Sequence, residues 1–206
     1  MNRSQRVISV VCGVALFVAM FVSIHNNSAQ ATRGLSPPEL LAQAIDDQDL
    51  DLMKAQLSKV DINGEIISHC TPLMLAVMAR RTDAIRLLVE SGANVNQTNG
   101  FGWTALHVAA STGDAYMVDL LLQHGADPNL KANKQITALI LAAQMTSDPV
   151  VRMLLGAGAD PRPREDTGRT AESVAEEAGD HALAEILRTA ASRFPAVARA
   201  RTGPAQ

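Results

Sequence analysis

The sequence predicts an all-α fold, a solenoid of short helical units that recur along the chain. One threonine recurs every 33 residues and is always followed by Pro or Ala; it stands at Thr71, Thr104, Thr137 and Thr170. A Gly-Ala-Asn or Gly-Ala-Asp triplet keeps the same interval and begins at Gly92, Gly125 and Gly158. A fixed period of this length is typical of stacked units that cannot bury their apolar faces alone.

The composition favours thin helices over one large aromatic core. Aromatic residues make up 3% of the 206 residues, whereas hydrophobic residues make up 47%. Small and aliphatic side chains suit closely packed helices. Because the repeats occupy residues 36–190 and leave only short ends, we expect a single domain that acts as a monomer.

Residues 1–31 have the order of a secretory signal peptide. Two arginines precede an uncharged stretch, residues 7–24, and Ala29 and Ala31 then supply the small residues of a cleavage site after Ala31. The uncharged stretch is nearly long enough to span a bilayer, so an uncleaved N-terminal anchor is the alternative. In both cases the arginines stay in the cytoplasm and the repeats are exported, which indicates a bacterial periplasm. Residues 32–35 form a short linker.

Removal of the signal leaves an acidic chain with one cysteine. Beyond residue 31 the sequence has 16 Lys and Arg against 21 Asp and Glu, which argues against nucleic acid as a partner. Cys70 is the only cysteine beyond residue 31, so no intrachain disulfide is expected there, even in an oxidising compartment. Contact with a membrane is expected only through residues 7–24, if they are retained.

The clearest unit spans residues 104–129. Thr104 is suited to cap a first helix, because its hydroxyl can accept a hydrogen bond from an unpaired N–H of the first turn. Gly113 ends this helix, and Asp114 can cap the next one. Gly125 permits the positive φ with which the chain leaves the second helix.

The Thr-Pro-Leu and Thr-Ala-Leu-His openings and the Gly-Ala-Asp triplets resemble the ankyrin repeat closely. The resemblance implies two helices and a protruding β-turn tip in each unit, and it implies binding of another protein. Ser36 and Glu39 look like a capping box that opens the first unit. About five units follow from this reading, of which the first and last are caps: residues 36–63, 71–96, 104–129, 137–162 and 170–189.

Two tips and one turn depart from the repeat. The glycine two residues before the threonine is replaced by His69 and Gln135 in two tips, which are expected to be less regular. Thr146 replaces the glycine between the two helices of its unit. After the last unit, residues 191–206 carry arginine, alanine and proline without acid, which predicts a disordered tail.

The sequence predicts no enzyme, no cofactor and no metal site. The histidines lack partners at a metal-ligand spacing such as His-x-x-x-His or Cys-x-x-Cys. No Gly-x-Ser-x-Gly elbow or phosphate-cradling glycine loop accompanies the Ser, His and Asp residues. The acidic run from Asp46 to Asp51 lacks the glycine and distal glutamate of a calcium loop, so it indicates helix caps and solvated surface.

The resemblance places the binding site on a concave face, made by the turn tips and the exposed side of each first helix. The positions expected there lie three and one before each threonine, and seven and eight after it. Ten of them are the predicted contact residues: Ser68, Cys70, Met78, Phe101, Trp103, Ser111, Lys134, Ile136, Gln144 and Met145. Phe101 and Trp103 are expected to be anchors, with the two methionines as adaptable flanks. Packing within the stack is the alternative role, above all for Ile136.

The sequence therefore predicts an exported protein-binding module. Two uses in the periplasm or envelope fit equally well, because both need a preorganised groove and neither needs catalysis. One is an immunity or inhibitor protein that occludes a toxic enzyme, and the other is a helper of a resident enzyme such as an antioxidant enzyme. The alternative is a membrane-tethered structural scaffold of the envelope that keeps residues 7–24.

Overall fold

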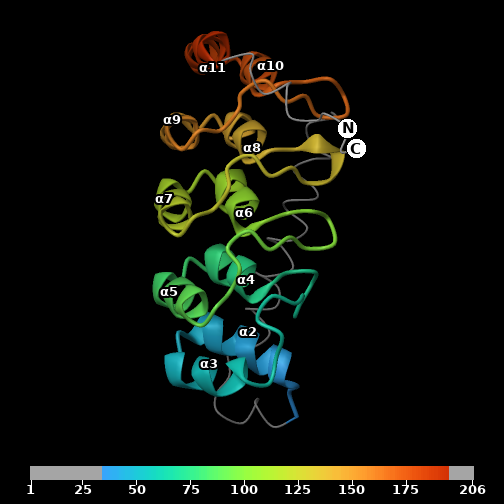
Figure 1. Ribbon diagram of the computed structural model, residues 1–206, viewed down its shortest axis with the longest axis vertical. Coiled ribbons are helices and arrows are strands. Elements are labelled where there is room, and N and C mark those ends of the chain that lie inside the picture. Colours follow the sequence, from blue (N-terminus) through green and yellow to red (C-terminus); the bar gives the residue numbers. More distant parts are fainter. Residues whose placement is uncertain (1–33, 195–206) are drawn as a thin grey trace, which may run out of the picture.

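The computed structural model describes residues 34–194, and within them ten α-helices stack as five consecutive pairs (Figure 1). In chain order the pairs are α2 (Pro37–Asp47) with α3 (Leu50–Leu57), α4 (Pro72–Met78) with α5 (Thr82–Glu90), α6 (Ala105–Ser111) with α7 (Ala115–Gln123), α8 (Ala138–Gln144) with α9 (Asp148–Gly156), and α10 (Ala171–Glu177) with α11 (His181–Arg193). A short 3-10 turn, η1 (Asn133–Gln135), lies at the tip that precedes α8. The predicted all-α solenoid of five helix-turn-helix units is confirmed.

Each unit contributes one layer to the stack. In Figure 1 the first helices of the units, α4, α6, α8 and α10, stack along the middle. The second helices lie on one side, and the hairpin tips project to the other side. Helix α6 packs against α7 of its own unit and against α4 and α8 of the neighbouring units. No helix among residues 34–194 is long and apolar enough to cross a membrane. The predicted signal peptide or anchor, residues 1–31, lies outside the described part of the chain.

The recurring threonine begins the first helix of each full unit. Thr104 Oγ1 accepts a hydrogen bond from the N–H of His107 at 3.4 Å, and the equivalent threonines cap α4, α8 and α10 in the same way. The first unit begins instead with Ser36, whose N–H and Oγ both donate to Glu39. These predicted caps are confirmed, and each provides polar partners where the first turn of a helix leaves groups unpaired.

Alanine and leucine fill the interior with the same period. Ala76, Ala109 and Ala142 of the first helices are 0% exposed, and their small size lets neighbouring units approach closely. The second helices bury one leucine each at the same interval: Leu88, Leu121, Leu154 and Leu187. Full burial of a leucine stabilises the fold by about 2 kcal/mol, so each unit depends on its neighbours for its stability.

The last unit carries charge where the inner units are apolar. Glu172 takes the place that leucine holds in α4, α6 and α8. Arg188 of α11 contacts Glu172 and Glu185 at 2.8 Å each, and it also contacts Glu176. These contacts suit the predicted terminal cap, because an end unit must expose one face to water.

The C-terminal boundary of the last unit differs from the prediction. Helix α11 continues to Arg193, so residues 191–193 belong to a helix and not to a disordered tail. Alanine favours continuation of the helix, and Phe194 turns to an extended conformation because Pro195 follows it. The rest of the predicted tail, residues 195–206, lies outside the described residues.

Asparagine side chains tie neighbouring units together in the loops that follow the second helices. Asn129 Oδ1 accepts a hydrogen bond from the N–H of Asp160 at 2.7 Å, and its Nδ2 donates to the carbonyl of Gly158 at 3.0 Å. Asn96, one period earlier, makes the equivalent two bonds, and Asn63 makes the first of them. Since each side chain bonds the backbone of the next unit, this series fixes the spacing between units.

One left-handed residue turns the chain between the two helices of every unit. These residues are Gln48, Arg80, Gly113, Thr146 and Gly179. Glycine adopts this conformation without steric cost, whereas Thr146, at φ 49°, places a β-branched side chain against its own backbone. Thr146 is therefore a strained position inside a regular turn.

Replacing Thr146 by Gly should raise the free energy of unfolding by about 1 kcal/mol, because the change relieves the left-handed strain. Urea unfolding followed by circular dichroism measures the effect. Thr112 is the matched control, since it follows α6 at φ −97°, where a glycine relieves no left-handed strain and removes a hydroxyl that donates to the carbonyl of Ala109 at 2.9 Å. Thr112→Gly should lower the free energy of unfolding by about 1 kcal/mol. Equal losses in the two variants would show that Thr146 is not strained.

Candidate functional site

The hairpin tips of neighbouring units join into one ridge. We call residues 65–70, 99–103, 131–136 and 164–169 the tip ridge. The N–H of Asn133 donates to the carbonyl of Phe101 at 3.0 Å, and the N–H of Asp166 donates to the carbonyl of Lys134 at 3.0 Å. Backbone hydrogen bonds therefore hold the last three hairpins side by side, as on the right of Figure 1.

The first junction of the tip ridge uses side chains instead. The N–H of Gly100 donates to the carboxylate of Glu65, which also pairs with His69 Nδ1 at 2.8 Å. Asn99 Nδ2 donates to the carbonyl of His69 at 2.9 Å. The bond from Gly100, followed by the contact with His69, lowers the pKa of Glu65. The carboxylate is thus held ionised between the second and third units.

The tips fall into two conformational types. In the tips that contain Gly102 and Gly168, the glycine is the one left-handed residue. The two tips without this glycine have two consecutive left-handed residues each, Ser68 with His69 and Lys134 with Gln135. Two adjacent positive φ angles define a mirror-image turn that suits a two-residue hairpin. In the two tips without glycine, non-glycine residues therefore hold the left-handed conformation, which is strained for them.

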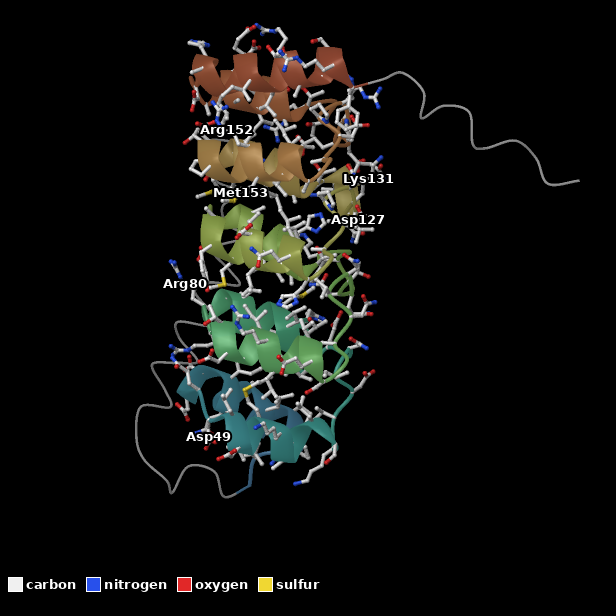
Figure 2. All side chains as sticks on the ribbon, turned by 60° about the vertical axis from the view of Figure 1, so that its left-hand side comes forward. Asp49, Arg80, Asp127, Lys131, Arg152 and Met153 are labelled. Carbon is white, nitrogen blue, oxygen red and sulfur yellow. The ribbon has the colours of Figure 1, made fainter. Side chains whose placement is uncertain are left out.

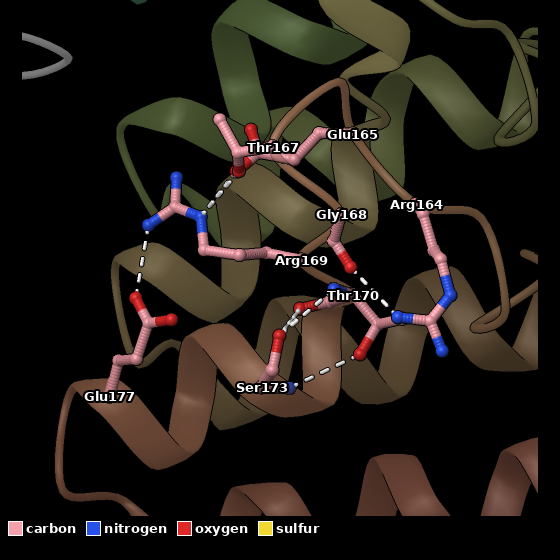
Figure 3. Close-up of polar contacts among 8 residues, drawn as sticks. All are labelled: Arg164, Glu165, Thr167, Gly168, Arg169, Thr170, Ser173 and Glu177. Atoms are coloured by element: carbon pink, nitrogen blue, oxygen red, sulfur yellow. Dashed lines mark hydrogen bonds and ion pairs between the residues drawn. The ribbon is translucent and has the colours of Figure 1, made fainter.

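Each tip folds back onto the first helix of its own unit. Cys70 Sγ lies 4.0 Å from Met78 Sδ, and Arg169 contacts Glu177 at 3.0 Å, as Figure 3 shows for the second pair. In both pairs, the residue before the threonine meets the residue seven positions after it. We call the surface made by these two rows, with the tips and the residue eight after each threonine, the inner face. It is the face predicted from the sequence to bind a partner.

The ten predicted contact residues differ in how much they are exposed. Ser68, Phe101, Lys134 and Met145 are exposed, with Phe101 at 52% and Met145 at 49%. Four others are half-buried: Met78, Trp103, Ile136 and Gln144. Cys70 and Ser111 are buried, at 4% and 6% exposure. The prediction that these last two contact a partner is therefore corrected: the tip covers Cys70, and the Ser111 hydroxyl donates to the carbonyl of Val108.

The two aromatic residues of the third tip differ in their surroundings. Phe101 is 52% exposed, and its ring makes a T-shaped contact with that of His69, with ring centres 5.4 Å apart. Trp103 packs against the core, and its ring centre lies 6.1 Å from that of His107. Asn99 Oδ1 accepts hydrogen bonds from the N–H groups of both aromatic residues, at 3.0 and 2.9 Å. Trp103 therefore supports the tip, whereas Phe101 stands free on it.

His107 joins the third and fourth units from a buried position. Its Nδ1 accepts from the N–H of Thr104 at 3.2 Å, and its Nε2 lies 3.3 Å from the carbonyl of Ile136, to which a neutral ring can donate. Burial disfavours the imidazolium form, and it lowers the pKa of His107 to about 4. The ring is therefore neutral near pH 7 and serves the packing of the stack.

In the three middle units, charge on the inner face is confined to the tips, and the two rows that pack against each other carry none. These rows hold Cys70, Met78, Trp103, Ser111, Ile136 and Gln144, and they carry charge only in the last unit. There Arg169 pairs with Glu177 and with the buried Glu165 (Figure 3). Burial, and then the neighbouring Glu65, raise the pKa of Cys70 to about 11, so its thiol stays protonated and unreactive. The face offers apolar contact rather than a nucleophile.

Two residues that shape the tip ridge were missed in the sequence. Asn99 and Glu165 both stand five residues before a threonine, in the tips that carry glycine. Each accepts two hydrogen bonds from its own hairpin. A polar residue three positions before the tip glycine was the available signal. The role of Glu65 could not be predicted in this way, because its partner Gly100 belongs to another unit.

The described residues provide no metal centre. No three His, Cys, Asp or Glu side chains between residues 34 and 194 gather in a way that could hold an ion. A shallow hollow of about 760 Å³ lies between α9 and α11, lined by Leu155, Ile186 and Phe194 among others. Helices α9 and α11 lie on the side of the second helices, away from the tip ridge (Figure 1).

The stacked helical pairs and the apolar rows of the inner face define the chain as a helical-repeat, protein-binding domain. The family described as "Ankyrin repeats (3 copies)" matches residues 41–132, and that described as "Ankyrin repeat" matches residues 134–166. The chain belongs to the ankyrin repeat family. Domains of this family are typically non-catalytic, and no enzymatic family matches.

Two relatives are similar over part of the repeats. One is a putative ankyrin repeat protein of Rickettsia felis, 30% identical over 76 residues, which are 37% of this chain and 20% of the relative. The other is Dauer abnormal formation protein 25 of Caenorhabditis elegans, 34% identical over 97 residues, which are 46% of this chain and 25% of the relative. The chain thus spans a quarter or less of these relatives.

The buried His107 should make stability depend on pH. Its pKa lies near 6.5 in the unfolded chain and at about 4 in the folded chain, so the unfolded state takes up a proton first as the pH falls. The contribution of neutral His107 to the free energy of unfolding is complete above about pH 6.5 and falls as the pH is lowered towards 4. At pH 5 the loss is about 2 kcal/mol. His107→Gln, which cannot titrate, should flatten urea-unfolding stability over this window. His181→Gln, at the exposed start of α11, should keep the wild-type slope.

The two tip aromatics should differ in their effect on stability. Trp103→Ala should lower the free energy of unfolding by about 2 kcal/mol, because it removes a ring that packs on the core. Phe101→Ala should lower it by less than about 1 kcal/mol, because its ring is mostly in solvent. Equal losses in urea unfolding would contradict the division of roles between the two rings.

Proposed function

We propose that the protein is an exported module that binds a periplasmic or envelope protein through its inner face. The observation that carries this proposal is the position of the exposed apolar side chains. Three large hydrophobic residues are exposed in the described part of the chain: Phe101, Tyr116 and Met145. Two of the three stand on the inner face, next to the half-buried Met78, Trp103 and Ile136. An apolar group without charge, bordered by polar residues, is the usual centre of a protein interface.

The proposed binding mode needs little rearrangement. The backbone bonds of the tip ridge and the asparagine series hold the inner face in place before a partner arrives. Preorganised surfaces lose less conformational entropy on binding, so more of the contact energy appears as affinity. Met78 and Met145 can adapt to the partner, because methionine is unbranched and flexible.

Two uses of this binding agree with export to the periplasm. One use is stoichiometric occlusion of a toxic enzyme, as an immunity or inhibitor protein. The other is docking onto a resident enzyme, such as an antioxidant enzyme, as its helper. Both uses need a preformed surface and neither needs a catalytic group on this chain. They are separated by adding the purified chain to the captured enzyme: inhibition supports the first use and sustained activity the second.

A membrane-tethered scaffold is the second candidate. The uncharged residues 7–24 favour it, since a retained segment of eighteen such residues nearly spans a bilayer. Mass spectrometry of the chain recovered from cells separates the candidates. A chain that begins at Thr32 is released into the periplasm, and a full-length chain in the membrane fraction is tethered.

Capture of a partner from a periplasmic extract tests the inner face. Phe101→Ala combined with Met145→Ala should reduce the captured partner at least about tenfold, because both changes remove exposed apolar contact. Tyr116→Ala is the matched control, since Tyr116 is 56% exposed but lies on the second helix α7. Circular dichroism should show all three chains equally folded. If Tyr116→Ala abolished capture and the double variant still captured the partner, the binding site would lie on the second helices.

A further inference from the structure

Most arginines of the described residues are paired with acid inside the chain. Residues 34–194 hold 13 Lys and Arg against 21 Asp and Glu, so carboxylates are in excess. Six arginines lie within 4.0 Å of a carboxylate oxygen: Arg80, Arg81, Arg152, Arg162, Arg169 and Arg188. The other seven cations form no ion pair with the described residues, and three of them lie together as a group.

Such a group lies on the last two hairpins of the tip ridge. Lys131 donates to a glutamine amide at 3.0 Å, and Arg164 donates to a glycine carbonyl at 2.8 Å (Figure 3 shows the second bond). Lys134 is exposed at the tip between them. None of the three forms an ion pair with the described residues. Lys131 does lie near Asp160, where it adds to the larger effect of Arg162 in lowering the pKa of that carboxyl.

We call Lys131, Lys134 and Arg164 the basic tip. Asp166 is exposed on the same two hairpins, whereas Glu165 is buried and paired with Arg169. The exposed charge of the two hairpins is therefore positive, although the domain as a whole is acidic. Figure 2 shows Lys131 on the edge formed by the loops, opposite Arg80 and Arg152 on the helical edge.

The hairpin that carries Lys131 and Lys134 adjoins the hairpin that carries Phe101. The N–H of Asn133, inside the basic hairpin, bonds the carbonyl of Phe101 at 3.0 Å. On the other side of Phe101, the carboxylate of Glu65 already accepts from Gly100 and His69. Glu65 is thus already paired within the chain, whereas the three cations of the basic tip have no carboxylate partner among the described residues.

We propose that the partner carries an acidic surface beside an apolar pocket, so that Phe101 enters the pocket while the basic tip meets the acid. This inference rests on the proposed function and adds the chemistry of the partner. Cations at the rim of an apolar contact mainly raise the association rate and orient the partner. Their effect falls with salt, because the Debye length shortens from about 10 Å at 0.1 M to a few ångströms at 1 M.

Selection from a phage library of random peptides of about twelve residues tests this chemistry on the purified full chain. The selected peptides should combine an apolar residue with Asp or Glu beside it. The double change Lys131→Glu and Lys134→Glu should weaken the binding of these peptides about tenfold or more at low salt, and less at high salt. Lys54→Glu with Lys59→Glu is the matched control, because these exposed lysines lie on and just after α3, and it should change affinity less than about twofold.

The outcomes separate this inference from the proposed function. Peptides that need Phe101 and Met145 but are neutral, and ignore the charge reversal, would overturn the acidic partner and leave the binding face standing. A selection with no peptide that depends on Phe101 or Met145 would overturn both. Binding of the full chain to phosphatidylglycerol vesicles that is lost on the charge reversal, without acidic enrichment in the peptides, would assign the basic tip to a lipid surface and overturn the inference.

Discussion

The contact between adjacent helical pairs is the interaction on which the rest of the structure depends. Helices α4, α6, α8 and α10 span seven residues each, and helices this short are not stable alone in water. They persist because alanine on one face lets the next unit approach, and because the second helices α5, α7, α9 and α11 bury leucine between layers. Stability is therefore a property of the stack, with neighbour contacts as its main term.

The polar groups between layers act only once that contact is made. The His107 ring contacts the Thr104 hydroxyl in its own unit and the carbonyl of Ile136 in the next. The asparagine series likewise joins a side chain of one unit to the backbone of its neighbour. Such bonds contribute about 1 kcal/mol each but fix the spacing and rotation of the units. The tip ridge inherits its regularity from this spacing, since its hairpins are joined by backbone bonds.

The same packing explains why the domain is suited to binding rather than to chemistry. The two potentially reactive groups near the inner face, the Cys70 thiol and the His107 ring, are buried and held in their neutral forms. The exposed residues of this face include apolar side chains, at Phe101 and Met145, and cationic ones, at the basic tip. A face of this kind offers contact area and electrostatic orientation, which are the terms that decide affinity and association rate in protein complexes.

Period and capping chemistry by themselves determined the five units, the threonine caps and the family, because each depends on residues close in sequence. Helix α11 ran past its predicted end, since alanine continues a helix until Pro195 stops it. The exposure of individual site residues was decided only by the tertiary structure. Cys70 stands one residue before its threonine and Phe101 stands three before the next one, and the period alone does not show that Cys70 is 4% exposed and Phe101 52% exposed. The bond between Glu65 and Gly100 likewise joins different units. The repeat period shows which positions are equivalent, but it does not show which side chains of two neighbouring layers meet.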